Sequence, residues 1–288
     1  MHKANLSRTY AVVILYNPTQ DQITRLIKQS VNFDECYVID NSAVISEILV
    51  DSCSCKYYPL LENVGIAEAQ NVAIIKILED EATSDDDLIY FFDQDSIYDE
   101  NLIKSLKLHF LKLYLEDQKN RVVGPCYVVD DEVVVERSTT EYQNKLSIIS
   151  SGTVTNVLTL KECGLMMSQL FIDCVDHEWC WRVDKMGFKI NQISSLKMSH
   201  KIGEGNLHFF GLIFNICGNV RCYYLFRNWV YLLSRNRVPS KILFKSFVLV
   251  LMRYIAYTFS NDGFSKSWYC LLGMKDGLLG RLGRREFQ

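Results

Sequence analysis

The sequence has few of the residues that interrupt folded chains, with four prolines and 14 glycines among 288 residues. This leaves no room for a long linker rich in proline and glycine, and neither an internal repeat nor a low-complexity tract is present. Disorder is also disfavoured, since 49% of the residues are hydrophobic and 23% are charged. We therefore expect one large globular domain, or one domain with an appendage.

Long apolar runs are absent as well. The N-terminus, MHKANLSRTY, is too polar for the hydrophobic region of a secretory signal, and we expect a cytoplasmic protein. The most hydrophobic segment, residues 241–259, is interrupted by Lys245 and Arg253. A helix that spans a membrane needs roughly 18 or more consecutive apolar residues, so this segment is predicted to be an interfacial or core helix.

Motifs of several common enzyme classes are missing. No GxGxxG follows the first predicted strand, which argues against a dinucleotide-dependent dehydrogenase. The sequence LYNPTQDQ at 15–22 is neither glycine-rich nor basic, as the phosphate loop of a nucleotidyltransferase would be. The ten cysteines include no CxxC pair and no histidines at matching spacing, so we expect them to be reduced and mostly buried.

Charge is distributed unevenly along the chain. Residues 200–288 contain 13 lysines and arginines and four acids, a net charge of +9, so the rest carries −12 within the total of −3. This basic region is rich in aromatic residues and predicts a surface that meets phosphates, from lipid headgroups or nucleic acid. The acidic body has no groove motif of aromatic and basic residues, which argues against nucleic acid.

Strand and helix patterns alternate through the first 130 residues. Apolar runs predict strands at 10–16, 36–40, 56–60 and 87–92, and helical spacing covers 19–30, the segment after Asn63-Val-Gly65, and 99–117. This alternation predicts an α/β fold with a mostly parallel central sheet and helices on both faces. Further along we expect strands at 121–129 and 146–160, a short acidic helix within 170–190 that Gly187 ends, and helices from about 215.

Polar residues follow the predicted strands at their carboxyl ends, where ligands of parallel sheets bind. They are Asn17-Pro18, Asp40-Asn41-Ser42 and Asp93-Gln94-Asp95, and we expect them to converge on one rim of the sheet.

Asp93 and Asp95 lie in LIYFFDQDS at 88–96. If the backbone stays extended through residue 95, both carboxylates point to the same side. Like charges so close are costly unless a cation offsets them, and a divalent cation that also binds diphosphate oxygens would do so. The alternative is an acidic turn that caps the next helix.

Three acids lie near the start of the predicted helix in LFIDCVDHEWCWRVDKMGFKI (170–190). Glu178 has a structural explanation, an i,i+4 pair with Arg182. Asp173 and Asp176 also favour the helix dipole, but they stand among apolar residues. Partial burial there would raise the pKa of a carboxyl toward the range of a general base.

Two basic residues have alternative explanations. His200 in KMSHKIG is either a structural histidine or the ligand that completes a metal site with Asp93 and Asp95. Arg227 in YYLFRNWVYLLSR either extends along an aromatic helix toward water or directs its guanidinium at a diphosphate.

In their order along the chain, these segments resemble the family 2 glycosyltransferases of the GT-A fold, and most closely the bacterial rhamnosyltransferase branch. The segments are VVILYNP, VIDNS, ENVGIAEAQN, FFDQDS, SSGT, LFIDCVDHEWCWRVDKMGF, H-x-x-G and YYLFRN. The resemblance covers about residues 10–235, and it departs from the family at Glu68 and Ala69, where glycine is frequent. It implies a GT-A domain with a Rossmann-like sheet at 1–210, and a helical, basic region at 211–288 on the acceptor and membrane side.

The resemblance also implies roles for individual residues. Asp40 would contact the nucleotide base. Asp93 and Asp95 would bind Mg²⁺ or Mn²⁺, with His200 completing the metal shell. Asp176, or alternatively Asp173, would be the catalytic base. The remaining residues expected to contact the nucleotide sugar are Tyr16, Asn17, Pro18, Asn41, Asn63, Gly65, Asn71, Gln94, Ser151, Gly152 and Arg227.

These roles imply an inverting, metal-dependent glycosyltransferase. It would move rhamnose from dTDP-rhamnose to a hydroxyl of a growing, lipid-linked cell-surface polysaccharide such as an O-antigen or capsule. The alternatives are a donor such as UDP-galactose or UDP-glucose, and a catalytically inactive module that binds sugar or lipid. The basic region would place the protein at the inner face of the cell membrane as a peripheral protein.

Overall fold

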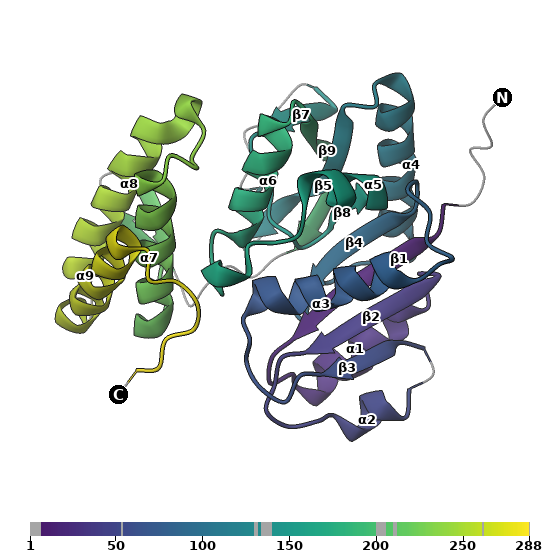
Figure 1. Cartoon of the computed structure of the whole chain (residues 1–288), viewed down its shortest axis with the longest axis horizontal. Helices are drawn as coiled ribbons and strands as arrows, with labels where there is room; N and C mark the ends of the chain where they lie inside the picture. The colour runs from purple at the N-terminus through teal and green to yellow at the C-terminus, as the bar shows by residue number, and fades with distance from the viewer. Residues whose placement is uncertain are drawn as a thin grey trace.

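The computed structural model describes residues 7–52, 54–129, 132–133, 140–199, 206–209, 212–260 and 262–287. They form an α/β domain with a group of C-terminal helices beside it (Figure 1). The expected boundary between residues 210 and 211, and His200, lie outside the described residues and stay predictions.

The first half of the chain alternates strands and helices, as the sequence predicts. Its elements are β1 (Thr9–Leu15), α1 (Gln20–Ser30), β2 (Glu35–Asp40), α2 (Glu47–Val50), β3 (Lys56–Pro59), α3 (Ile66–Glu79), β4 (Leu88–Asp93) and α4 (Glu100–Glu116). The helix starts follow local capping signals. Thr19 and Gln22 form a capping box at α1, and the side chain of Asp99 accepts from the Leu102 amide at α4.

The second half begins with β5 (Asn120–Val129), β6 (Glu132–Val133), β7 (Tyr142–Lys145), β8 (Thr153–Asn156), α5 (Val157–Cys163), the 3-10 helix η1 (Ser168–Leu170), α6 (Val175–Lys185) and β9 (Lys189–Ser199). It continues with β10 (Asn206–Phe209), β11 (Leu212–Asn215), α7 (Asn219–Ser234), α8 (Ser240–Thr258) and α9 (Gly263–Leu279). The strand expected at 146–160 is therefore limited to 153–156. Helix α5 follows directly because the Asn156 side chain accepts from the Thr159 amide and caps it.

The central sheet has the order β3-β2-β1-β4-β8-β5-β9-β7, with β6 paired to β5. Its first four strands are parallel, and beyond β4 the sheet is mixed, because β8 is antiparallel to both β4 and β5. In register, Leu15 is opposite Asp40 and Ile14 is opposite Asp93. The carboxyl ends of β1, β2 and β4 therefore meet at one rim, as expected.

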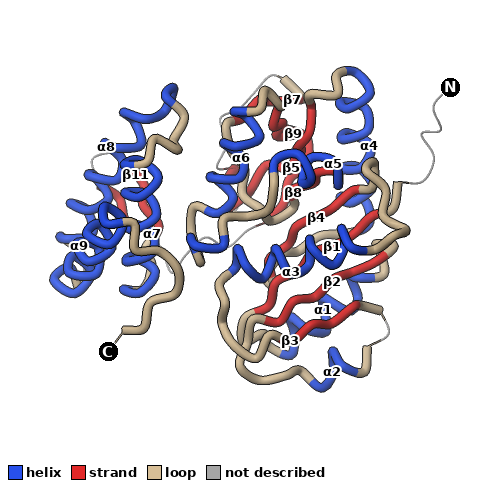
Figure 2. Tube along the Cα trace, in the orientation of Figure 1, coloured by secondary structure: helices blue, strands red, loops and turns tan. Residues whose placement is uncertain are grey.

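Helices cover both faces of the sheet (Figure 2). On one face, Tyr10, Val12 and Ile14 of β1 pack in a cluster with residues of α3, α5 and α6. On the other, Ala11, Val13 and Leu15 pack in a cluster with residues of α1 and α4. This alternation follows from the two-residue period of a strand, and it places α6 against the same face as α3.

The C-terminal helices pack through small residues. An added Cβ at Gly273 of α9 would lie 2.3 Å from the Tyr223 carbonyl oxygen of α7, and one at Gly277 would lie 2.4 Å from that of Arg227. The two glycines therefore let α7 and α9 approach backbone to backbone. No helix in the described parts of the chain has the length and hydropathy needed to cross a bilayer.

Candidate functional site

The rim after β1 and β2 is a network of polar side chains. Asp40 is fully buried, and its carboxylate accepts from the Ser42 amide at 3.1 Å and from the Tyr57 hydroxyl at 2.6 Å. Asn41 donates to the Asn63 side-chain oxygen at 2.9 Å and accepts from the Val64 amide at 2.8 Å. These bonds connect the end of β2 to the loop before α3. They therefore hold Asn41 next to Asn63, two of the residues expected to contact the nucleotide sugar.

The turn after β4 differs from its expected geometry. Residues 94 and 95 form a turn, and the backbone does not stay extended through residue 95. The Asp93 amide donates to Ser96 Oγ at 2.9 Å, and the Ser96 amide donates back to the Asp93 carbonyl at 3.0 Å. Helix α4 is capped by Asp99 instead, so capping does not explain Asp93 and Asp95.

Gln94 joins this turn to the neighbouring elements. Its side-chain oxygen accepts from the Tyr16 amide at 2.7 Å, and its carbonyl accepts from Arg25 Nη2 at 3.1 Å. The turn after β4 is thereby fixed to the end of β1, which places Tyr16 and Asp93 on the same rim.

Asp93, Asp95 and Asp176 form an acidic group at this rim. Burial raises the pKa of Asp93 to about 7, and the negative charges of Asp95 and Asp176 act in the same direction. Asp176 belongs to the first turn of α6, so two elements far apart in sequence bring their carboxylates together. Within the described residues, no group of three histidines, cysteines or acids has the geometry to bind a metal ion by itself.

The other acids of this helix have different partners. Asp173 forms an ion pair with Arg221 of α7 at 3.0 Å, and it raises the pKa of Arg221. Glu178 is 2% exposed and binds Arg182 at 3.0 Å, the predicted i,i+4 pair, and Arg237 at 3.2 Å. Asp176 is therefore the acid of the segment whose charge acts on Asp93, while Asp173 and Glu178 have cationic partners.

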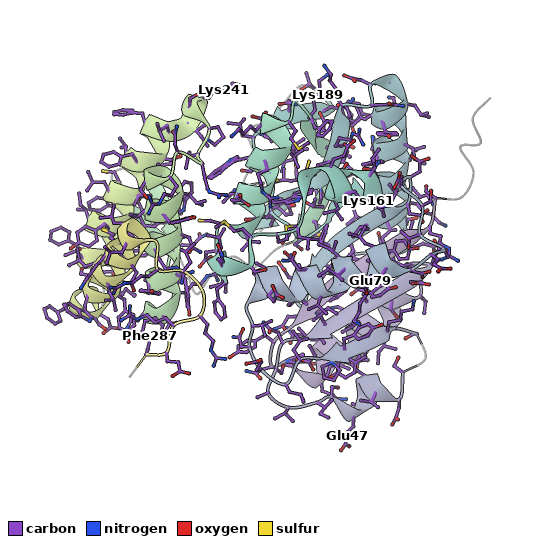
Figure 3. The ribbon with its side chains drawn as sticks, viewed as in Figure 1. Glu47, Glu79, Lys161, Lys189, Lys241 and Phe287 are labelled. Carbon is purple, nitrogen blue, oxygen red and sulfur yellow. The ribbon has the colours of Figure 1, made fainter. Side chains whose placement is uncertain are left out.

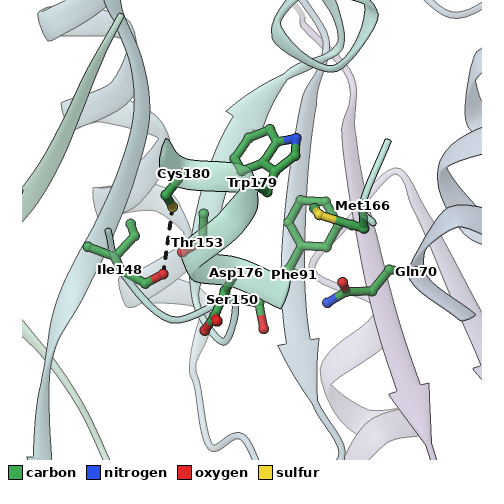
Figure 4. Close-up of a pocket in the computed structure, with 9 residues that line it drawn as sticks. All are labelled: Gln70, Phe91, Ile148, Ser150, Thr153, Met166, Asp176, Trp179 and Cys180. Atoms are coloured by element: carbon green, nitrogen blue, oxygen red, sulfur yellow. Dashed lines mark hydrogen bonds between the residues drawn. The ribbon is translucent and has the colours of Figure 1, made fainter. Parts of the chain in front are cut away.

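A small apolar cavity lies beside Asp176 (Figure 4). Its lining residues are Gln70, Phe91, Ile148, Ser150, Thr153, Met166, Asp176, Trp179 and Cys180. Figure 4 shows the Asp176 carboxylate beside Ser150 at one side of this cavity.

The segment that precedes α6, residues 170–174, has strained backbone, and we call it the pre-helix segment. Phe171, Asp173 and Cys174 all have positive φ, at 67°, 64° and 63°. Each such conformation costs about 1–3 kcal/mol in a residue other than glycine. Gly65, also with positive φ, packs directly on this segment, because an added Cβ would lie 2.5 Å from the Phe171 ring and 2.6 Å from its carbonyl oxygen.

Arg227 occupies a different environment from the one expected of a diphosphate ligand. It is fully buried, and its guanidinium donates to the Leu170 carbonyl at 2.8 Å, to the Gln169 carbonyl at 3.3 Å and to the Gly283 carbonyl. Burial lowers its pKa. With its N–H groups directed at main-chain carbonyls, Arg227 is not free to reach a ligand at the rim.

Other expected contact residues have structural partners. Asn71 is bonded through its amide to the backbone of Met166 and to Ser168 Oγ, all at 2.9 Å. Ser151 is fully buried and bonds Ser96 Oγ at 2.6 Å. Gly152 has φ of 76° and donates to the Phe91 carbonyl at 2.7 Å. These residues support the turn after β4 and the pre-helix side of the site rather than projecting into solvent.

The sequence interpretation singled out Arg227-Asn228 but assigned Arg221 no role in the site. Arg221 is half-exposed and its charge lowers the pKa of Asp93, so it is a basic side chain at the acidic group. A usable signal was present, since Arg221 precedes Arg227 by six residues in the same predicted helix. Only Arg227 was considered as a diphosphate contact, because helical spacing alone does not show which of the two arginines lies near Asp93.

Comparisons with known proteins give the following similarities. No family model matches the chain. The chain is 31% identical to the dTDP-rhamnosyl transferase RfbF of Shigella flexneri over 267 residues, which cover 85% of this chain and 86% of that protein. Over this length, identity at that level indicates common descent.

Two solved structures share the fold. The crystal structure of GalNAc-T7 with UDP, GalNAc and Mn²⁺ has a TM-score of 0.55 at 10% identity, and the match covers 96% of this chain and 57% of that one. The structure of S. aureus TarS has a TM-score of 0.52 at 13% identity, covering 88% and 44%. The chain thus spans about half the length of these two proteins, and the likeness concerns the fold alone.

Proposed function

Because the chain belongs to the bacterial rhamnosyltransferase branch of the family 2 glycosyltransferases, we propose that it transfers rhamnose from dTDP-rhamnose to a hydroxyl of a growing cell-surface polysaccharide. The observation that carries this proposal is the 31% identity with a dTDP-rhamnosyl transferase over most of both chains. The acidic group at the sheet rim supports an active enzyme over an inactive sugar- or lipid-binding module. A UDP-sugar such as UDP-galactose or UDP-glucose is the alternative donor.

The residues at the rim suit a divalent cation. Asp93 and Asp95 offer carboxylate oxygens, the donors that Mg²⁺ and Mn²⁺ prefer. A bound cation would offset the burial and the repulsion from neighbouring carboxylates that together raise the pKa of Asp93. Two carboxylates leave ligand positions for diphosphate oxygens and water, and for His200. When bound, the cation would stabilise the negative charge that develops on the diphosphate.

Asp176 is the proposed general base. Its carboxylate belongs to the acidic group and acts on Asp93, whereas that of Asp173 is paired with Arg221. An acceptor hydroxyl would lose its proton to Asp176 as its oxygen attacks the anomeric carbon, and the bond electrons would leave with the nucleoside diphosphate. This single displacement inverts the anomeric centre and requires no enzyme nucleophile.

Arg221 replaces Arg227 as the proposed cationic contact of the diphosphate. It is 52% exposed and lies near Asp93, and its guanidinium matches the geometry of phosphate oxygens. Its ion pair with Asp173 would hold it in place before the donor binds.

The proposed acceptor is attached to a polyprenyl diphosphate lipid, and the chain would act at the inner face of the cell membrane. We define the aromatic face as Phe244 of α8, Phe259 directly after α8, and Phe264 and Trp268 of α9, which are 80%, 79%, 92% and 63% exposed. Lysines accompany it, with Lys241 at the start of α8 (Figure 3), and α8 contains no acid. Aromatic side chains next to lysines suit an anionic lipid surface. A second copy of the chain bound to this face would bring the lysines of the two chains together, and their repulsion would disfavour such a dimer.

The donor is tested by thermal denaturation of the purified chain with dTDP or UDP, each with Mg²⁺ or Mn²⁺. Ligand binding raises the unfolding free energy by RT ln(1+[L]/Kd), so selective stabilisation by dTDP is the expected result. Selective stabilisation by UDP would establish the alternative donor, and no stabilisation by either nucleotide would contradict the proposed function.

The base is tested by transfer from dTDP-rhamnose in two variants. Asp176→Asn should lower kcat by about 10²–10⁴ and leave dTDP affinity unchanged, because a general base acts only in the chemical step. Asp173→Asn is the comparison variant: it loses the ion pair with Arg221, so it should weaken dTDP binding and keep the base. Normal transfer by Asp176→Asn together with inactivity of Asp173→Asn would reverse the assignment.

A further inference from the structure

Asn228 of α7 is fully buried beside Arg227 and bonds the pre-helix segment from across the fold. Its Nδ2 donates to the carbonyl oxygens of Leu170, Ile172 and Asp173 at 2.9, 2.7 and 2.9 Å. Its Oδ1 accepts from Arg227 Nε at 3.0 Å. An amide nitrogen has two hydrogens, so the three bonds are shared and the whole amide is used.

These contacts hold the backbone of the pre-helix segment in conformations that are unfavourable without them. Phe171 has φ 67° and ψ −65°, and the Ile172 amide donates to the Leu170 carbonyl at 2.8 Å, which is the geometry of a strained γ-turn. Asp173 and Cys174 follow with positive φ. Non-glycine residues keep such conformations only where their surroundings impose them. Asn228 and Arg227 supply that constraint, because they bind the carbonyls of the segment itself.

The segment leads without a break into α6. Cys174 is the N-cap residue of α6 in a left-handed conformation, and its carbonyl accepts from the Glu178 amide at 2.9 Å. Asp176 lies in this first turn, so the direction in which the segment enters the helix sets the direction of its side chain. The Phe171 ring also stacks on Tyr224 of α7 at 4.9 Å between ring centroids.

We propose that Arg227 and Asn228 are positioning residues that hold the strained pre-helix segment and thereby orient the Asp176 carboxylate toward the acceptor hydroxyl. The proposal rests on the proposed function in taking Asp176 as the base. It gives α7 a role in positioning the base. This role is additional to the proposed contribution of the C-terminal helices to acceptor or membrane binding.

The C-terminal tail takes part in the same arrangement. Arg227 also donates to the Gly283 carbonyl, and the Gly283 amide donates to the Gln169 carbonyl at 2.7 Å. The residues after α9 therefore supply a further carbonyl oxygen to the Arg227 guanidinium and connect to the residue before the pre-helix segment.

The test is Asn228→Ala, with Asn219→Ala as its matched control. Asn219 lies in the same helix, and its Nδ2 donates to Ser265 Oγ at 2.9 Å, away from the pre-helix segment. Asn228→Ala should lower kcat about 100-fold, the loss expected of a 1 Å misplacement, with dTDP affinity unchanged. Its backbone amides at 171–178 should exchange hydrogen faster. Asn219→Ala should show neither effect.

A milder variant covers the case in which Asn228→Ala does not fold. Arg227→Lys keeps the positive charge but loses most of the donors to the carbonyls, and it should lower kcat less, with the same faster exchange at 171–178. Folded variants with a kcat close to that of the wild type would overturn the proposal, as would a loss confined to dTDP affinity.

The proposal and the proposed function fail in different ways. If the wild type transfers no rhamnose, the proposed function is contradicted, and amide exchange still tests the positioning contacts. Exchange at 171–178 that is equal in Asn228→Ala and Asn219→Ala would overturn the positioning role whatever the donor is.

Discussion

Replacing Gly65 by alanine tests how tightly the loop before α3 determines the pre-helix segment. Gly65 has φ 87° and ψ 158°, a conformation that is almost restricted to glycine and costs other residues about 1–3 kcal/mol. The added Cβ would also lie 2.5 Å from the Phe171 ring, 2.6 Å from its carbonyl oxygen and 2.9 Å from its Cα. Two of these are backbone atoms, and overpacking of this kind costs about 1–3 kcal/mol more.

The expected loss for Gly65→Ala is therefore about 2–6 kcal/mol, a large part of a typical stability of 5–15 kcal/mol. At roughly 2–4 °C per kcal/mol, thermal denaturation followed by circular dichroism should show a clearly lowered Tm. Rhamnosyl transfer at a temperature where the variant stays folded should fall too, because Phe171 must shift and Asp176 follows it within five residues.

Gly187 provides the matched control. It has nearly the same φ, 84°, but an added Cβ would meet no atom within 4 Å. Gly187→Ala should then cost only the conformational part, about 1–2 kcal/mol, and leave transfer unaffected. A Tm for Gly65→Ala as high as that for Gly187→Ala would refute the reasoning, since it would mean that Phe171 yields to the added methyl group without cost.

Two further predictions concern charge and the aromatic face. Folding raises the pKa of Asp93 from 3.8 to about 7, so the ionised carboxyl destabilises the folded state as the pH rises through this range. Without divalent cations, Asp93→Asn should therefore raise the Tm more at pH 8 than at pH 5, and an equal gain at both would contradict the assigned electrostatics. The double variant Phe264→Ser, Trp268→Ser should sediment less with phosphatidylglycerol vesicles than the wild type. Leu115→Ser, which changes a residue 71% exposed on α4, should sediment normally, and an equal loss in both variants would argue against the aromatic face.

The first half of the fold and its rim could be predicted from the sequence. Apolar runs and helical spacing are local signals, so the strands up to β4 and their polar ends at Asp40 and Asp93 were found where expected. The Glu178–Arg182 pair was predicted by the same means, since i,i+4 spacing on a helix determines which side chains meet. The strand predicted at 146–160 was too long, because apolar residues suit either a strand or a helix. The Asn156 side chain caps α5 and ends the strand there.

The sequence by itself determined which carboxylates are available and on which element each lies, because hydrophobic period and turn residues act over a few positions. Only the tertiary structure decided their partners. The charge of Asp176 acts on Asp93, Asp173 pairs with Arg221, and Arg227 is enclosed by carbonyl oxygens. These pairings join residues far apart in the sequence, and those of Asp173 and Arg227 depend on where α7 packs against the pre-helix segment. Burial then decided the role of Arg227, since a guanidinium enclosed by main-chain carbonyls holds the pre-helix segment and is not available to a phosphate.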